Sequence, residues 1–357
     1  MSRNQALSRR AVLKGVLAAG ATAGAGAVLS ACGSSATSSG GSGKGLRVAL
    51  GWTPNVQWAG YWIADDSGYY RDQGVDVTFA TGGENKPDPT VLVSSGSADI
   101  GVGASMPFIM QSIANKNDFV LLGTTWQQAA NCYISLPERP VRSASDLVGA
   151  TILANQGHQN TLNAILKVNN LPERYDFKVR GYDPSILVKG VGNVLSGVLT
   201  NEPISLELTQ SKVPGKDFIV TSAHSMGYSM YANVVFCKRE FLARNRDAVI
   251  GFMRATVKGW QRNAADPDHA VDLTMNKYGR TLGLEREQQK RSNLAAIPLV
   301  ETEYTKKSGM FRIDVQRLQS DDYKIMGLLG VQGLPAAASI VDQTVLDAVY
   351  RDGLTVR

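Results

Sequence analysis

Short apolar runs alternate with helically spaced apolar residues through the first part of the chain. Residues 46–50 form an apolar run that stops at Gly51, which is typical of a buried parallel strand. Residues 56–66 then place apolar side chains at helical spacing. The same alternation continues with strands at 75–79, 100–103 and 119–123 and helices at 89–95 and 105–114. This rate of alternation predicts a doubly wound parallel sheet with helices on both faces, an α/β fold.

A second alternating unit begins after a break at residues 137–143. The pattern predicts strands at 150–154, 177–180, 194–199 and 218–221 and a helix at 160–168. A strand-like run at 231–237 precedes a mainly helical region, with helices expected at 246–263, 267–277, 285–295 and 314–328. Together with a length of 357 residues, the pattern indicates about two domains.

The positive charge of the chain is concentrated at its amino terminus. There are 37 Lys and Arg residues against 31 Asp and Glu, a net charge of +6. Four of the basic residues lie within residues 1–31, which contain no acidic residue. Without them the balance is 33 to 31, so the basic character belongs largely to this segment. Nucleic acid is therefore not expected as a partner.

Residues 1–31 have the features of an export signal. Arg9 and Arg10 resemble a twin-arginine motif, and a weakly apolar stretch rich in Ala and Gly follows. The stretch ends in Leu-Ser-Ala-Cys-Gly, which resembles a lipobox with Cys32 as the lipidated residue. A transmembrane anchor is the alternative, because the stretch is close to ~20 residues long; its low hydrophobicity and the internal Lys14 count against that. We expect a bacterial lipoprotein on the extracytoplasmic face of the cell membrane.

Residues 32–44 are rich in Ser and Gly and predict a flexible tether. Beyond this tether, Cys132 and Cys237 lack the spacing of a metal knuckle; they could pair in an oxidising compartment or stay as buried thiols. The three histidines are widely spaced, and no Walker, Rossmann or Gly-x-Ser-x-Gly motif occurs. We therefore expect no metal, no cofactor and no catalytic residue.

Several motifs resemble one family. Residues 51–55 (Gly-Trp-Thr-Pro-Asn) and 69–77 resemble the start of the thiamine-pyrimidine-precursor family of extracytoplasmic solute-binding proteins. Further markers of that family have counterparts at 94–101 (Ser-Ser-Gly-Ser-Ala-Asp-Ile-Gly), 146–150 (Asp-Leu-Val-Gly-Ala) and 267–270 (Pro-Asp-His-Ala). The resemblance runs from about residue 46 to 280. Its superfamily also takes up sulfonates, taurine, nitrate and riboflavin.

The resemblance implies a type II periplasmic-binding-protein fold, a clamshell of two lobes. The first lobe would comprise residues 45–135 and 235–357, and the second lobe residues 137–230. Residues 133–135 and 234–236 would be the hinge strands. The ligand would bind at the carboxyl ends of the strands of both lobes, where sheets of this kind place their sites.

Aromatic residues near these strand ends are candidates for stacking on a flat ligand. Trp52 lies in the loop after the first strand, and Trp126 follows the strand at 119–123. Trp58 and Tyr61 on the first helix are further candidates. Trp58 and Trp62 are four residues apart, so packing against the core is the alternative for both.

Polar residues near the strand ends would supply hydrogen bonds. The candidates are Asn55, Ser105, Gln156, His158, Asn201 and Glu202. Helix capping is the alternative role for Ser105, and likewise for Glu202. As a carboxylate, Glu202 would suit the edge of an aminopyrimidine and would repel sulfonate or nitrate.

We therefore expect a monomeric solute-binding lipoprotein of an ABC importer, acting with permease and ATPase subunits. Its small-molecule ligand would be a flat heterocyclic nutrient, such as a thiamine pyrimidine precursor or a riboflavin-like compound. A receptor for sulfonate, taurine or nitrate is the alternative, and a sensor that signals instead of importing is another. A pyrimidine-precursor biosynthetic enzyme, like the eukaryotic relatives of the family, is a further alternative. Residues 56–66 hold neither the Lys nor the His of those enzymes, and no Cys cluster occurs.

Overall fold

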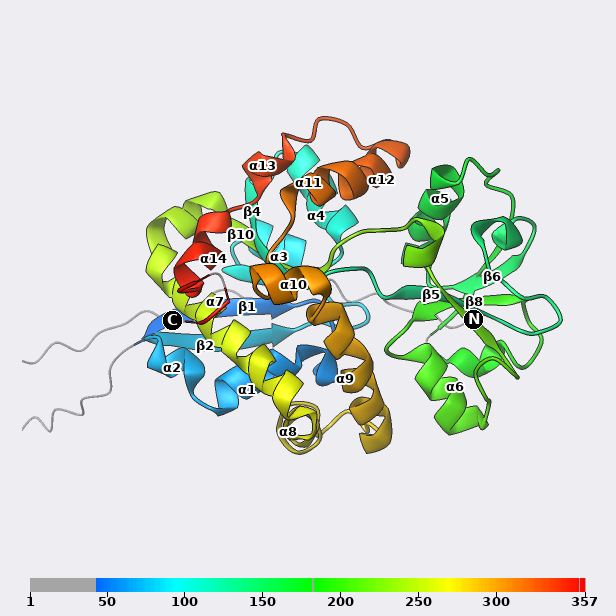
Figure 1. Cartoon of the computed structure of the whole chain (residues 1–357), viewed down its shortest axis with the longest axis horizontal. Helices are drawn as coiled ribbons and strands as arrows, with labels where there is room; N and C mark the ends of the chain where they lie inside the picture. Colours follow the sequence, from blue (N-terminus) through cyan, green and yellow to red (C-terminus); the bar gives the residue numbers. More distant parts are fainter. Residues whose placement is uncertain (1–42, 182, 353, 357) are drawn as a thin grey trace, which may run out of the picture. The chain divides into compact units, whose positions relative to one another are not determined.

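Within the residues that the structure describes, the strands form two separate five-stranded sheets (Figure 1). The computed structural model describes residues 43–357, except residues 182, 353 and 357. In the first sheet the order is β2-β1-β3-β10-β4. These strands are β1 (Lys44–Leu50), β2 (Val75–Thr81), β3 (Ile100–Ala104), β4 (Phe119–Trp126) and β10 (Ala232–Lys238). The signal segment, Cys32 and nearly all of the tether lie outside the described residues.

The second sheet has the order β7-β6-β8-β5-β9. Its strands are β5 (Asn131–Ser135), β6 (Thr151–Ala154), β7 (Asp176–Val179), β8 (Val194–Val198) and β9 (Ile219–Ser222). Residues 41–357 form one compact unit that contains both sheets.

Each sheet contains one strand that runs against the others. β10 is antiparallel to β3 and β4, and β5 is antiparallel to β8 and β9. These are the strands by which the chain passes from one sheet to the other. Ala232 pairs with Trp126, and Asn131 pairs with Val198, so each crossing strand starts beside the carboxyl end of a neighbour.

The prediction of two α/β sheets is confirmed, but the sheets are mixed and not wholly parallel. Apolar periodicity could not show this, because the crossing strands are buried on both faces like their parallel neighbours. The predicted first lobe also included residues 131–135, whereas β5 pairs in the second sheet. The other lobe limits stay predictions.

Helices cover both faces of the first sheet (Figure 1). Alternate strand residues point to opposite faces. Val48 and Leu122 therefore pack with the side of α1 (Ala59–Asp66) and α7 (Arg239–Ala265), while Ala49 and Leu121 pack with the side of α4 (Met106–Ala114). The remaining helices around this sheet are α2 (Tyr69–Asp72), α3 (Pro89–Ser94), α8 (Pro267–Leu273), α9 (Arg286–Val300), α10 (Glu303–Ser308), α11 (Val315–Arg317), α12 (Tyr323–Leu328), α13 (Ala337–Ile340) and α14 (Gln343–Val349).

The second sheet has one helix on each face. Leu162 of α5 (Gln159–Val168) packs with Ile152, and Leu206 of α6 (Glu202–Gln210) packs with Leu153. Within the described residues, no helix has the length and apolar character needed to cross a membrane.

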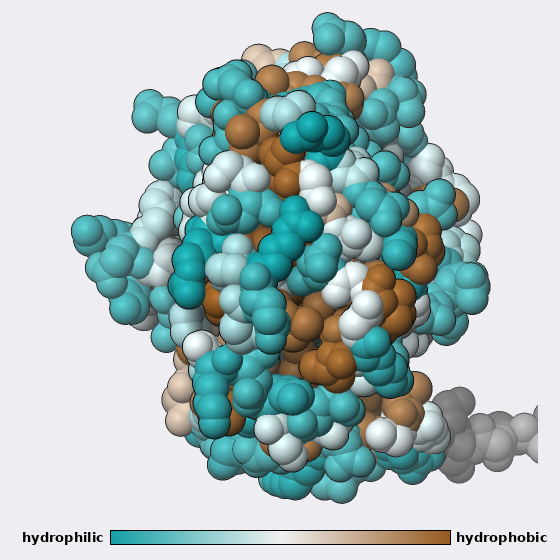
Figure 2. Space-filling view, turned by 90° about the vertical axis from the view of Figure 1, so that its right-hand side faces the viewer, coloured by the Kyte–Doolittle hydropathy of each residue, from teal (hydrophilic) through white to brown (hydrophobic). Residues whose placement is uncertain are grey.

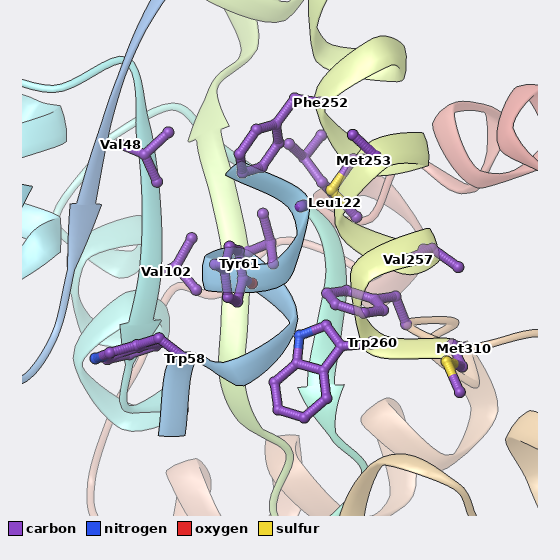
Figure 3. Close-up of a cluster of buried hydrophobic side chains, with 14 of the residues drawn as sticks. Val48, Trp58, Tyr61, Val102, Leu122, Phe252, Met253, Val257, Trp260 and Met310 are labelled. Atoms are coloured by element: carbon purple, nitrogen blue, oxygen red, sulfur yellow. The ribbon is translucent and has the colours of Figure 1, made fainter. Parts of the chain in front are cut away.

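A close crossing of α1 and α7 is the tightest contact in the core of the first sheet. Figure 3 shows Tyr61 of α1 between the strands and the α7 residues Phe252 and Trp260. A Cβ added at Gly60 would lie 2.2 Å from the Trp260 ring, and one at Gly259 would lie 2.0 Å from the Gly60 carbonyl oxygen. Only glycine lets the two helices approach this closely.

We expect Gly259→Ala to lower the free energy of unfolding by about 1–3 kcal/mol, the usual cost of overpacking. The added methyl group meets backbone, which cannot rotate away. The matched control is Gly327→Ala in α12, where an added Cβ has no described atom within 4 Å. That change should raise stability by up to about 1 kcal/mol, because Ala favours helix over Gly. Urea unfolding measures both, and a Gly259→Ala variant as stable as the parent would contradict the crossing.

Candidate ligand-binding site

The predicted site residues lie at one edge of each sheet. In the first sheet, Trp52 follows β1, Ser105 follows β3 and Trp126 ends β4. In the second sheet, His158 follows β6 and Glu202 follows β8. Because the parallel strands of a sheet end at the same edge, the topology brings each set together within its own sheet.

Asn55 holds the loop after β1 in a fixed shape. Its Oδ1 accepts a hydrogen bond from the Gln57 N–H at 2.9 Å and caps η1 (Val56–Trp58). Its carbonyl oxygen accepts from Trp62 Nε1 at 2.9 Å, and the Trp62 ring stacks on Tyr278 with centroids 4.2 Å apart. Trp52 in the same loop is half-buried and packs against the core. The loop is therefore fixed at its start by the packing of Trp52 and at its end by the hydrogen bonds of Asn55.

Trp58 and Tyr61 are fully buried in the core of the first sheet (Figure 3). Trp58 Nε1 donates to the Thr53 carbonyl oxygen at 3.1 Å, and its ring lies against Gly103. Tyr61 Oη is 3.3 Å from Thr125 Oγ1, and burial raises the pKa of the Tyr61 hydroxyl well above its ordinary value. The structure gives both side chains a packing role, so their predicted contact with ligand gains no support from it.

Ser105 and Trp126 differ in exposure. Ser105 is exposed, and in the described structure its side chain does not cap α4. Trp126 is only 5% exposed, and its Nε1 has no hydrogen-bond partner among the described residues. Both remain candidates, one as an accessible hydroxyl and the other as an unused N–H donor.

At the edge of the second sheet, His158 can form hydrogen bonds as an uncharged imidazole. Its Nδ1 lies 2.8 Å from Ser196 Oγ, in a position set by β8. Burial, with a smaller effect of the Arg180 charge, lowers the pKa of His158 to about 4. The imidazole is therefore neutral at pH 7. The neighbouring Gln156 is exposed.

Glu202 is buried and paired inside the second half of the fold, and its contact with ligand stays a prediction. Its Oε1 lies 3.3 Å from Arg180 NH2, and its Oε2 accepts from the Val198 N–H at 2.7 Å. The side chains of Arg180 and Glu202 are 1% and 4% exposed. Sequence reasoning missed Arg180, which directly follows β7 and carries no signal of an internal partner.

Asn201 takes part in a link between α6 and α9. Its Oδ1 accepts from Gln288 Nε2 at 2.8 Å, and nearby Arg291 NH2 lies 2.7 Å from Glu207 Oε2. Gln289, which follows Gln288 in α9, accepts a hydrogen bond from the Val56 N–H through its Oε1 at 3.0 Å. Helix α9 therefore contacts both the loop after β1 and the second-sheet helix α6.

Asn233 is a residue that sequence reasoning missed. It is 6% exposed, and its φ of 51° is in the left-handed region. Its Oδ1 accepts from Gln57 Nε2 at 3.0 Å, while its Nδ2 has no partner among the described residues. An amide inside an otherwise apolar strand run was the available signal.

A cavity of about 910 Å³ lies away from all of these residues. It is lined near Phe119, at the amino end of β4, by charged side chains such as Lys116 and Arg239. Arg239 forms an ion pair with Asp118, and apolar residues such as Ile340 and Val341 complete the lining. The face turned toward the viewer in Figure 2 is mainly hydrophilic, with separate hydrophobic areas. Exposed apolar side chains are therefore a poor guide to the site.

The described residues include neither a cluster of possible metal ligands nor a disulfide bond. There, no group of three or more His, Cys, Asp or Glu residues could hold a metal ion. Cys132 and Cys237 are both buried free thiols, and burial raises the pKa of each. Of the two alternatives left by the sequence, the structure shows the unpaired one.

A family model described as NMT1/THI5 like matches residues 55–270, more than half of the chain. The chain belongs to the NMT1/THI5-like family. This confirms the resemblance drawn from the motifs at 51–55 and 69–77.

Two relatives of this NMT1/THI5-like chain have names that refer to binding. It is 24% identical to the riboflavin-binding protein RibY of Chloroflexus aurantiacus, over 76% of this chain and 77% of the relative. It is 23% identical to a formylaminopyrimidine-binding protein of Halalkalibacterium halodurans, over 64% and 69%. A yeast 4-amino-5-hydroxymethyl-2-methylpyrimidine phosphate synthase is 22% identical over 62% and 68%.

The fold is also that of solved binding proteins. The periplasmic aliphatic sulphonate binding protein SsuA of Escherichia coli superposes with a TM-score of 0.60 at 14% identity, covering 85% of this chain and 99% of that one. The two-lobe periplasmic-binding-protein fold expected from the sequence is thereby confirmed.

The buried Arg180–Glu202 pair predicts a coupled effect on stability. Arg180→Met should lower the free energy of unfolding by about 3–5 kcal/mol, because it leaves a buried carboxylate without its cation. Adding Glu202→Gln should restore most of that loss, since the carboxamide carries no charge. Urea unfolding of the single and double variants gives the coupling. Additive losses in the double variant would show that the two groups do not interact.

Proposed function

We propose that this chain is the extracytoplasmic solute-binding lipoprotein of an ABC importer for a flat heterocyclic nutrient. The nutrient is a thiamine pyrimidine precursor or a riboflavin-like compound. Binding closes the two lobes over the ligand, and the closed form is presented to a membrane permease whose ATPase supplies the energy. The protein acts as a monomer held to the membrane by the lipid on Cys32.

One observation carries the choice of ligand class. The edge of the first sheet offers aromatic side chains, Trp52 and Trp126, together with uncharged polar groups. The only charged side chain predicted for the site, Glu202, is neutralised by Arg180 inside the second half of the fold. An uncharged aromatic site suits a flat heterocycle. The names of the Chloroflexus and Halalkalibacterium relatives support the same class.

The alternative is a receptor for sulfonate, taurine or nitrate, the class of ligand named for the Escherichia coli structure. With Glu202 paired, its charge no longer argues against an oxyanion. An oxyanion is bound most strongly by charged donors such as Arg. None of the ten residues predicted to bind ligand is a Lys or Arg. The heterocycle therefore remains the better match.

A calorimetric and thermal-shift screen tests this function. The full chain should bind riboflavin or 4-amino-5-hydroxymethyl-2-methylpyrimidine and should not be stabilised by taurine, alkanesulfonates or nitrate. Trp52→Ala should weaken the bound heterocycle by about tenfold or more, because stacking area is lost. The variant should still fold and unfold cooperatively, at a somewhat lower temperature because Trp52 also packs against the core. Unchanged affinity would remove Trp52 from the site, and tight binding of an oxyanion alone would replace the proposed function by its alternative.

The proposed lipid anchor is tested separately in cells. Cys32→Ser should abolish incorporation of labelled palmitate, because the thiol that would carry the lipid is gone. The parent chain, labelled in parallel, is the control. Labelling that persists in the variant would rule out Cys32 as the anchor.

A further inference from the structure

Two buried N–H donors lack a partner at the ligand edge of the first sheet. They are Trp126 Nε1 and Asn233 Nδ2, in residues that are 5% and 6% exposed, and neither has an acceptor among the described residues. Buried donors in native proteins are nearly always paired with protein, water or ligand. Trp126 Nε1 and Asn233 Nδ2 are unused donors on neighbouring strands at this edge, where an acceptor from outside the chain could pair with them.

The two donors belong to adjacent positions of neighbouring strands. Trp126 ends β4 and pairs with Ala232, and Asn233 is the next residue of β10. This is the edge at which Trp52 and Ser105 also lie. The donors are thus part of the proposed ligand site and not of the cavity near Phe119.

The local backbone and one hydrogen bond determine which end of the Asn233 amide remains unused. Asn is among the few residues that adopt the left-handed region readily, and the strand pairing shifts register between Val234 and Val235. Irregularities of this kind re-aim side chains beside functional sites. Asn233 Oδ1 already accepts from Gln57 Nε2, which belongs to the loop after β1. The group left over is the N–H donor.

The acid that would complement an amino group is not presented. Both oxygens of Glu202 are engaged, one by Arg180 and one by the Val198 N–H. An aminopyrimidine edge joins an N–H donor to a ring-nitrogen acceptor, and its amino group is best matched by an acceptor such as a free carboxylate. A heterocycle with an imide edge presents two carbonyl acceptors around one N–H, and this edge has the two unused N–H donors together with one unused acceptor, Gln127 Oε1.

We propose that Asn233, assisted by Trp126, donates hydrogen bonds to a carbonyl oxygen of the ligand, so that the site selects a carbonyl-bearing heterocycle over an aminopyrimidine. Asn233 is thereby a specificity-determining residue. This inference rests on the proposed function, which leaves the two classes of heterocycle open.

The test is calorimetry on the full chain in mild detergent with riboflavin, a ring dione, and with 4-amino-5-hydroxymethyl-2-methylpyrimidine. Riboflavin should bind at least tenfold more tightly. Asn233→Gly keeps the left-handed backbone without strain and should weaken riboflavin about fivefold to tenfold, the value of one hydrogen bond. Asn233→Asp keeps the acceptor for Gln57 but turns the donor into an anion. This variant should lower the affinity for riboflavin further and reduce the difference in affinity between riboflavin and the aminopyrimidine.

Trp126→Phe and Trp260→Phe form a matched pair of indole substitutions. Trp260 Nε1 is also buried without a described partner, but it lies in α7 against Gly60. We expect Trp126→Phe to weaken riboflavin about fivefold and Trp260→Phe to leave its affinity within twofold of the parent.

The failures are distinguishable. If neither heterocycle binds the parent chain, the proposed function is wrong and this inference falls with it. If a heterocycle binds but Asn233→Gly and Asn233→Asp leave both affinities within twofold, the orphan donors are satisfied by water and only this inference is wrong. Tighter binding of the aminopyrimidine, or a gain for it in Asn233→Gly, would likewise overturn the assignment while leaving the proposed function standing.

Discussion

The position of the site depends on how the chain passes between its two sheets. Each crossing strand must enter a sheet of otherwise parallel strands, and β10 and β5 do so beside the carboxyl ends of β4 and β8. The two connections therefore lie at the same edges as the loops that follow the parallel strands. Any hinge motion at these connections acts directly on the ligand edge. If the connections between the sheets lay at the opposite edges, hinge motion would occur far from the loops that follow the parallel strands.

The loop after β1 is held in place by side chains that are not predicted to contact the ligand. Trp62 holds the Asn55 carbonyl, and Gln289 holds the Val56 N–H, so the loop is fixed from a core helix and from α9. Such support reduces the entropy lost when a ligand is bound. The close α1–α7 contact keeps Trp62 in place, because α1 cannot shift without opening the core. The shape of this loop thus depends on the packing at Gly60 and Gly259.

Much of this fold could be predicted from the sequence, because apolar periodicity reports burial and the motifs report the family. Strand direction could not, since a buried strand has the same pattern whether it runs parallel or antiparallel to its neighbours. Residues at strand ends were also predictable as a set. Their individual partners were not: Glu202 was proposed to contact ligand or cap a helix, and its buried pairing with Arg180, 22 residues away in sequence, leaves no trace in the pattern. Asn233 was missed because its unused N–H is visible only once every other partner has been placed.

Helix α9 joins the two parts of the site through links of different strength. Its bond from Gln289 to the loop after β1 is buried, whereas its contacts to α6, Arg291–Glu207 and Gln288–Asn201, are at least partly exposed. Partly exposed ion pairs contribute little net free energy. The contact between α9 and α6 is therefore too weak to hold the lobes together by itself. Closure then depends on the ligand, because only a molecule that contacts both strand edges adds a differential free energy that favours the closed form. A binding protein requires this balance, since it must close on its ligand and open again to release it.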